Sequence, residues 1–115
     1  MIIVVEGTKS FSDYETFMRA MGVALSQLDD SNSIEVWSAG PHAINNFTAA
    51  FCNSAENYLR QKGYKISFRK LPQSHIADRI DDINYLAFFS KKNEKSSSLV
   101  ARAELSNIEI GIFKS

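Results

Sequence analysis

Two short segments of the sequence carry the side chains best suited to hold a small phosphate-bearing ligand. In the first, Gly7 allows close approach of the backbone, Thr8 and Ser10 offer hydroxyl groups, and Lys9 offers positive charge. The free N–H groups at the start of a following helix would complete an anion site. The same residues equally suit an ordinary strand-to-helix turn, so both interpretations stay open.

The second segment follows another apolar run and again precedes a helical pattern. Ser38, Gly40, His42 and Asn45 are the residues in it that we expect to contact a ligand. A single glycine matches neither the dinucleotide-binding fingerprint nor the phosphate-binding loop of nucleotide hydrolases. Pro41 also removes a backbone donor that an anion would use. The segment therefore favours a binding role without defining the ligand.

Other candidate chemistry is weaker. The loop at 90–98 has three lysines, which could close over a phosphate or simply form a polar surface. His42 and His75 lack acidic neighbours at ligand-like spacing, so we expect no metal site and no cofactor. The single cysteine, Cys52, lies in an apolar helical pattern and is interpreted as a buried small hydrophobic residue. No nucleophile elbow is present, and no catalytic residue is assigned.

Short apolar runs alternate with helical patterns along the whole chain, and this alternation must position the candidate residues. Strands are predicted at 2–5, 34–37, 64–68, 85–89 and 108–113, and helices at 14–28, 43–61, 75–82 and 98–105. Ser12 or Asp13, Ser74 and Gly63 are the expected helix caps. The alternating 64–68 run suits an edge strand. The expected fold class is α/β: a three-layer, Rossmann-like open parallel sheet of about five strands with three or four helices, in one domain spanning 1–115.

Bulk composition limits the function classes. Lys and Arg number 13, as do Asp and Glu, so the net charge is zero and nucleic acid is an unlikely partner. The apolar N-terminal run ends at Glu6, too early for an export signal, and no apolar stretch could span a membrane. Together with one unpaired cysteine, this predicts a cytoplasmic protein with no membrane partner.

The order of these segments resembles the SLOG superfamily of small Rossmann-like domains, most closely its YspA-like branch. The likeness is carried by the strand and turn at 4–13, the strand and glycine loop at 34–40, the late apolar strand at 85–89 and the last helix at 96–105. The resemblance implies nucleotide binding at the carboxyl ends of the strands. The second loop lacks the family's acid and further glycines, and the signature of the LOG-type nucleotide hydrolases is missing from 90–98.

We therefore expect a non-catalytic domain that binds a nucleotide or nucleotide-derived ligand. The alternative is a protein-interaction or accessory module, for example one encoded by a phage or mobile element, that keeps the fold without the pocket. Such a module would bind a protein partner or form a homo-oligomer, with the 64–68 edge as its expected surface. A nucleotide-directed enzyme and DNA binding in the manner of DprA are the remaining possibilities.

Overall fold

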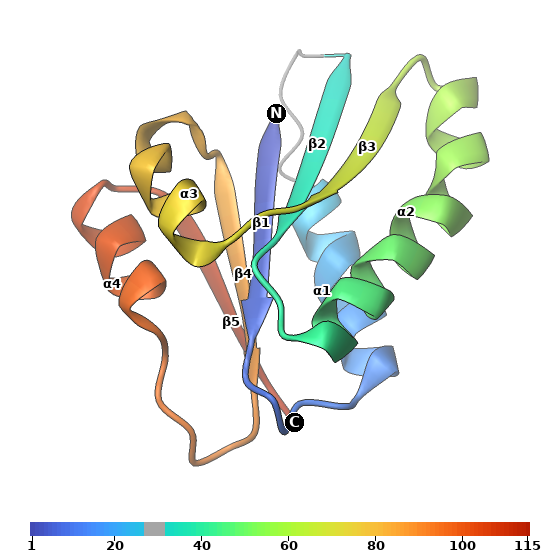
Figure 1. Ribbon diagram of the computed structural model, residues 1–115. Helices are drawn as coiled ribbons and strands as arrows, with labels where there is room; N and C mark the ends of the chain where they lie inside the picture. Colours follow the sequence, from blue (N-terminus) through green and yellow to red (C-terminus); the bar gives the residue numbers. More distant parts are fainter. Residues whose placement is uncertain (27–31) are drawn as a thin grey trace.

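A computed structural model describes residues 1–26 and 32–115 of the chain as a parallel β-sheet covered by helices on both faces (Figure 1). The strands are β1 (Ile2–Gly7), β2 (Ser33–Ser38), β3 (Lys65–Lys70), β4 (Tyr85–Ser90) and β5 (Glu109–Lys114). They lie in the order β3-β2-β1-β4-β5, and every neighbouring pair is parallel. The expected α/β class and five-stranded open parallel sheet are confirmed.

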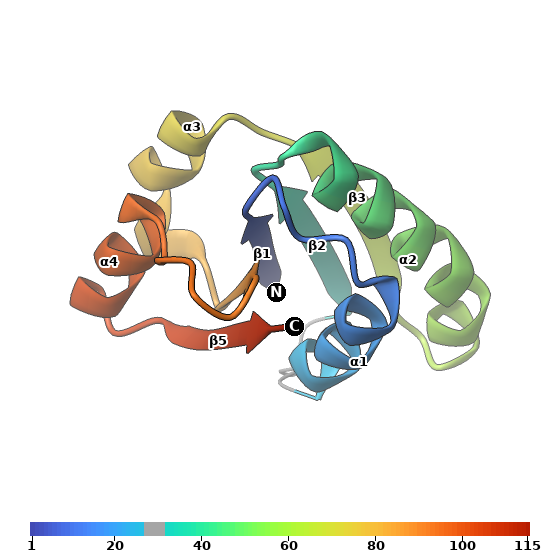
Figure 2. The same cartoon turned by 90° about the horizontal axis from the view of Figure 1, so that it is seen from below.

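The helices are α1 (Tyr14–Leu25), α2 (His42–Gln61), α3 (Gln73–Asp78) and α4 (Ser98–Leu105), with a 3₁₀ turn at Ile80–Asp82. Figures 1 and 2 show α1 and α2 on one side of the sheet and α3 and α4 on the other. The connection from β3 to β4 passes β2 and β1 and changes the face that the helices cover. The strand order therefore reverses between β1 and β4, where open α/β sheets bind ligands.

Two apolar cores fill the layers. The core beneath α1 and α2 contains Val5, Phe17, Ile44 and Phe89, and the core beneath α3 and α4 contains Val4, Trp37, Ile76 and Leu86. All residues of β4 are buried, as expected for a strand with helices on both faces. At the edge, β3 alternates exposed and half-buried residues, which confirms its predicted position.

Local signals set most helix boundaries. Asp13 caps α1, accepting hydrogen bonds from the Thr16 amide at 3.1 Å and hydroxyl at 2.8 Å. Gly63 follows α2 with a φ of +87°, the left-handed conformation that glycine adopts without strain. The predicted first helix extended to Leu28, and the segment 27–31 lies outside the described residues.

Two local predictions are wrong. Ser74 does not cap the third helix, which begins at Gln73 with Pro72 at its N-cap and is followed by a separate 3₁₀ turn. Proline ends the preceding loop with a fixed φ and so starts the helix earlier than the serine signal indicated. The apolar spacing of α2 predicts Tyr58 on its buried side, but Tyr58 is 60% exposed, with the Lys62 ammonium 5.1 Å from its ring centre.

Candidate functional site

The carboxyl ends of the strands meet at one edge of the sheet, at the bottom of Figure 1 and facing the viewer in Figure 2. The turn after β1 and the loop between β4 and α4 lie side by side there, as expected at the reversal of strand order. An aromatic cluster supports this turn from below: Phe11 and Phe17 have ring centres 5.2 Å and 4.8 Å from that of Phe89. Closely packed aromatic side chains therefore support this edge of the sheet.

Four of the predicted ligand-binding residues form one internally bonded group. The Gly7 amide donates to the Gly40 carbonyl at 3.2 Å, and the Gly40 amide donates to the Ser38 hydroxyl oxygen at 3.2 Å. The Ser38 hydroxyl in turn donates to the Asn45 side-chain oxygen at 2.6 Å. A Cβ atom on Gly7 would stand 2.7 Å from the Phe89 carbonyl oxygen. Close packing between β1 and β4 thus accounts for this glycine.

Two further predicted residues contact a carboxylate from the β4–α4 loop. Glu94 accepts the Thr8 hydroxyl at 2.7 Å, the Ser10 hydroxyl at 2.6 Å and the Lys91 amide at 2.7 Å. These hydrogen bonds, that of Ser10 foremost, hold the pKa of Glu94 below its ordinary value. The turn is therefore an anion cradle, and the anion in it is the chain's own side chain.

The remaining two predicted residues, Lys9 and His42, have no hydrogen bond to either group. Lys9 is exposed and makes no ion pair with the described residues. His42 is exposed at the first position of α2, with its Nε2 atom 3.3 Å from the Asn46 side-chain nitrogen. All eight predicted residues thus lie at the same edge, but they do not converge on one cleft.

A buried carboxylate at this edge was missed by the sequence reasoning. Glu6, near the end of β1, is 5% exposed and accepts hydrogen bonds from the Gln73 amide group and the Ser97 hydroxyl. Ser97 also caps α4 by accepting from the Val100 amide at 3.3 Å. The signal in the sequence was an acidic residue, Glu6, directly after the apolar run at 2–5. Glu6 ties the starts of α3 and α4 to the central strand.

A hollow of about 480 Å³, here called the β4–β5 hollow, opens beside Glu94 at the same edge. Its residues come from the ends of β4 and β5 and from the loop between β4 and α4: Phe88, Ser90, Glu94, Lys95, Ser96, Ile112 and Lys114. Ser90 is fully buried, and its hydroxyl oxygen makes no hydrogen bond within the described part of the chain. Buried hydroxyl groups ordinarily have a hydrogen-bond partner, and the Ser90 hydroxyl departs from this rule among the described residues.

The β4–β5 hollow is lined by two lysines, Lys95 and Lys114, and by the Glu94 carboxylate. Lys95 is exposed on the loop, and the Lys114 ammonium donates to the backbone carbonyls of Lys92 at 3.4 Å and Glu94 at 3.3 Å. Phe88 and Ile112 supply an apolar floor. The hollow can therefore contact both an anionic group and a flat apolar one.

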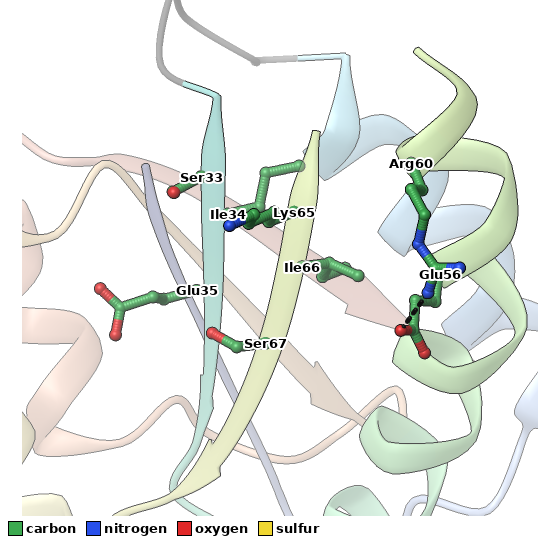
Figure 3. Close-up of a pocket in the computed structure, with 8 residues that line it drawn as sticks. All are labelled: Ser33, Ile34, Glu35, Glu56, Arg60, Lys65, Ile66 and Ser67. Atoms are coloured by element: carbon green, nitrogen blue, oxygen red, sulfur yellow. Dashed lines mark hydrogen bonds and ion pairs between the residues drawn. The ribbon is translucent and has the colours of Figure 1, made fainter. Parts of the chain in front are cut away.

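A second hollow, here called the β2–β3 hollow, lies at the opposite ends of the strands (Figure 3). It has a volume of about 520 Å³ and is bounded by the first residues of β2 and β3 and by the last turns of α2. Glu56 and Arg60 of α2 form an ion pair at 2.6 Å beside it. None of the eight predicted residues lines this hollow.

The described residues contain neither a cluster of metal-ligating side chains nor a helix that could span a membrane. Among residues 1–26 and 32–115, no group of three His, Cys, Asp or Glu side chains is placed to hold a metal ion. Within the same ranges, no helix is long and apolar enough to cross a membrane. Comparison of the sequence with known protein families and with curated proteins finds no match.

Proposed function

We propose that this domain binds a small anionic ligand of the nucleotide class at the carboxyl edge of its sheet, in the β4–β5 hollow. The observation that carries the proposal is the fully buried Ser90 hydroxyl, which lacks a partner among the described residues and lines a hollow with two lysines. Because the Ser90 hydroxyl has no exposed area, a ligand oxygen would reach it only after the lining of the hollow moves, and it would then satisfy a group whose burial without a partner costs about 1–3 kcal/mol.

The size and chemistry of the hollow fit such a ligand. Small-molecule sites typically measure about 300–1,000 Å³ and combine apolar walls with a few polar groups. The floor formed by Phe88 and Ile112 suits a base or another flat ring, whereas Lys95 and Lys114 suit a phosphate or carboxylate. The location next to the reversal of strand order agrees with the general rule for open α/β sheets.

The predicted residues of the β1 turn enter this proposal through Glu94. A ligand phosphate that extends from the β4–β5 hollow towards Thr8 and Ser10 must displace the Glu94 carboxylate, because both hydroxyls already donate to it. Lys9 is an exposed cation of the same turn. Contacts from Gly7, Ser38, Gly40 and Asn45 stay a prediction, since their hydrogen bonds are used within the chain.

A thermal-shift series tests the proposal. Inorganic phosphate, AMP, ADP, cyclic nucleotides and NAD are added to purified protein, and a ligand present at 100 times its Kd stabilises the fold by about 2.7 kcal/mol. We expect a rise in Tm with at least one nucleotide, reduced in Lys95→Ala and in Ser90→Ala. Lys92→Ala, which changes an exposed lysine of the same loop outside the hollow, is the matched control.

The outcomes separate the candidate locations. A rise that survives in Lys95→Ala but is lost in Lys9→Ala would move the site to the β1 turn and refute the β4–β5 hollow. Absence of any rise across the series would refute nucleotide binding altogether. A relation to the SLOG superfamily, a non-catalytic role and the alternative of a protein-interaction module remain predictions beside this proposal.

A further inference from the structure

The zero net charge of the chain conceals one strongly basic segment. Residues 57–77 contain five Lys or Arg residues and no Asp or Glu. This segment comprises the end of α2, all of β3 and the start of α3. Lys65, Arg69 and Lys70 of β3 are exposed and form no ion pair with the described residues. The edge of the sheet formed by β3 is therefore positively charged, although the net charge of the chain is zero.

Lys65, Ser67 and Arg69 lie on the α3 and α4 side of the sheet, on a part of that face, here called the open face, where Ser33 is exposed and Trp37 is buried. Lys65, Ser67 and Arg69 pair in register with Ser33, Glu35 and Trp37 of β2 and share their face. In Figure 1 no helix lies in front of the first half of β2 and β3, and α2 lies to the right of β3. Each residue of a strand rises about 3.3 Å, so Lys65 and Arg69 lie about 13 Å apart along the edge, with Ser67 between them.

The outer side of β3 presents backbone groups for pairing. The Lys65 amide donates to the Asn32 carbonyl at 2.8 Å and the Leu71 amide to the Ser38 carbonyl at 3.0 Å, so the odd-numbered amides of this segment point towards β2. Because backbone direction alternates along a strand, the amides and carbonyls of Ile66, Phe68 and Lys70 point outwards. Since β3 is at the end of the strand order, these groups face the surroundings.

These two features together define the chemistry of a partner. An added strand would place alternate side chains opposite Lys65, Ser67 and Arg69 on the open face, where acidic residues complement the charge. Its intervening side chains would lie beside the half-buried Ile66 and Phe68 on the α2 side, where apolar residues fit. The β2–β3 hollow, whose lining includes Lys65 and Ser67, leaves space next to the start of this edge (Figure 3).

A nucleic acid fits this edge less well. The aromatic ring on the same face, Trp37, is fully buried, and the Arg79 guanidinium lies 4.9 Å from its centre, so it offers no surface on which a base could stack. Glu35, half-buried on the same face, would also repel a phosphate backbone. A nucleic acid would leave the outward amides and carbonyls of β3 without the paired partners that an extended peptide supplies.

We propose that the outer edge of β3 binds an extended peptide segment with alternating acidic and apolar residues, which adds to the sheet as a further strand. Backbone hydrogen bonds supply affinity, and Lys65 and Arg69 select for acidic residues on the open face. This site is separate from the β4–β5 hollow, because β3 and β5 are the opposite ends of the sheet.

Fluorescence anisotropy with a defined probe tests the proposal. The probe is a fluorescein-labelled peptide of alternating glutamate and valine, about eight residues long to span the edge strand. A second peptide has the same sequence with alternate backbone nitrogens methylated, which keeps its charge but removes the donors of one strand edge. The protein variants are the double reversal Lys65→Glu with Arg69→Glu, and a control, Arg19→Glu with Lys92→Glu, with the same charge change at exposed sites elsewhere.

We expect the unmodified peptide to bind the native chain and the control variant, and to lose affinity about tenfold or more in the β3 variant. The methylated peptide should not bind. No binding of the unmodified peptide overturns the proposal, and equal binding of both peptides overturns strand addition in favour of simple charge attraction. A labelled oligothymidine that binds more tightly than the peptide, with the same loss in the β3 variant, would assign the edge to nucleic acid instead.

Discussion

At the residue scale, the carboxyl edge is organised by two acidic side chains with different surroundings. Glu6 is buried and joins two helix starts to the central strand, whereas Glu94 lies in a loop and reaches the turn after β1. Both occupy hydrogen-bond donors that an anionic ligand would otherwise use. Donors that remain for a ligand among the described residues of this edge include those of the β4–β5 hollow and the exposed Lys9.

The environment of Glu94 predicts a measurable titration. Its pKa in the folded chain should lie below the ordinary 4.5, because two hydroxyls and an amide donate to the charged form. This carboxylate thus stabilises the fold above pH 4.5, and the contribution is lost as the pH falls through the lowered pKa. An NMR titration of the Glu94 carboxyl carbon measures the value. Thr8→Ala with Ser10→Ala should return the pKa towards 4.5, and an unchanged pKa in this variant would refute the assigned cause.

Two glycines give a matched pair of substitutions. Gly7→Ala would bring a Cβ atom to 2.7 Å from a backbone oxygen and 3.0 Å from the Ile44 side chain. The expected cost is about 1–3 kcal/mol of unfolding free energy. Gly22→Ala, on the exposed face of α1 with nothing within 4 Å, should instead stabilise the chain by about 0.5–1 kcal/mol. Urea denaturation measures both, and a neutral Gly7→Ala would contradict the close packing of β1 against β4.

At the element scale, α4 is fixed by its first turn. Ser97 accepts from the Val100 amide and donates to the buried Glu6, so a single hydroxyl caps the helix and satisfies a carboxylate in the core. This contact spans 91 residues of sequence and joins the β4–α4 loop to β1. The position of that loop, and hence of the β4–β5 hollow, depends on it.

Ser97→Ala should therefore cost more than an ordinary cap. Loss of the cap costs about 1 kcal/mol, and a buried acceptor left without its donor adds about 1–3 kcal/mol. Ser98→Ala, at the neighbouring exposed position, should change the unfolding free energy by less than about 0.5 kcal/mol and serves as the control. Equal effects of the two substitutions in chemical denaturation would show that the Glu6 contact contributes nothing.

The sequence predicts the elements better than the contacts between them. The alternation of apolar runs and helical stripes is local, so the order and type of the described strands and helices are recovered, except that the predicted helix at 75–82 is a shorter α3 followed by a 3₁₀ turn. The wrong cap at Ser74 arose because a serine and a preceding proline are both helix-start signals, and Pro72 prevails. The sequence assigns no role to Glu94 and Ser97, because their hydrogen-bond partners are distant in the sequence and only the strand order brings them close. It assigns none to Ser90, because the lack of a partner for its hydroxyl is visible only in the folded chain.

At the scale of the whole molecule, the single thiol reports on unfolding of the domain. Cys52 is 7% exposed in the core beneath α2, and burial raises its pKa from 9.0 to about 12. The reactive thiolate is therefore scarce in the folded state. We expect reaction with a chromogenic disulfide reagent to be slow in buffer and to accelerate through the same urea range as unfolding. Rapid labelling in buffer would contradict the burial of Cys52.

The two outer strands of the sheet have separate proposed roles: the small-molecule site lies beside β5, and the peptide-binding site lies along β3. The most direct test of the first, which is the central claim, is a titration of ¹⁵N-labelled protein with ADP followed by amide chemical shifts. The predicted result is a set of saturable shifts at Ser90, Lys95, Ser96 and Lys114, with little change in the first half of β3. Saturation with shifts confined to residues outside the carboxyl edge, or no shifts with ADP, AMP or inorganic phosphate, would contradict it.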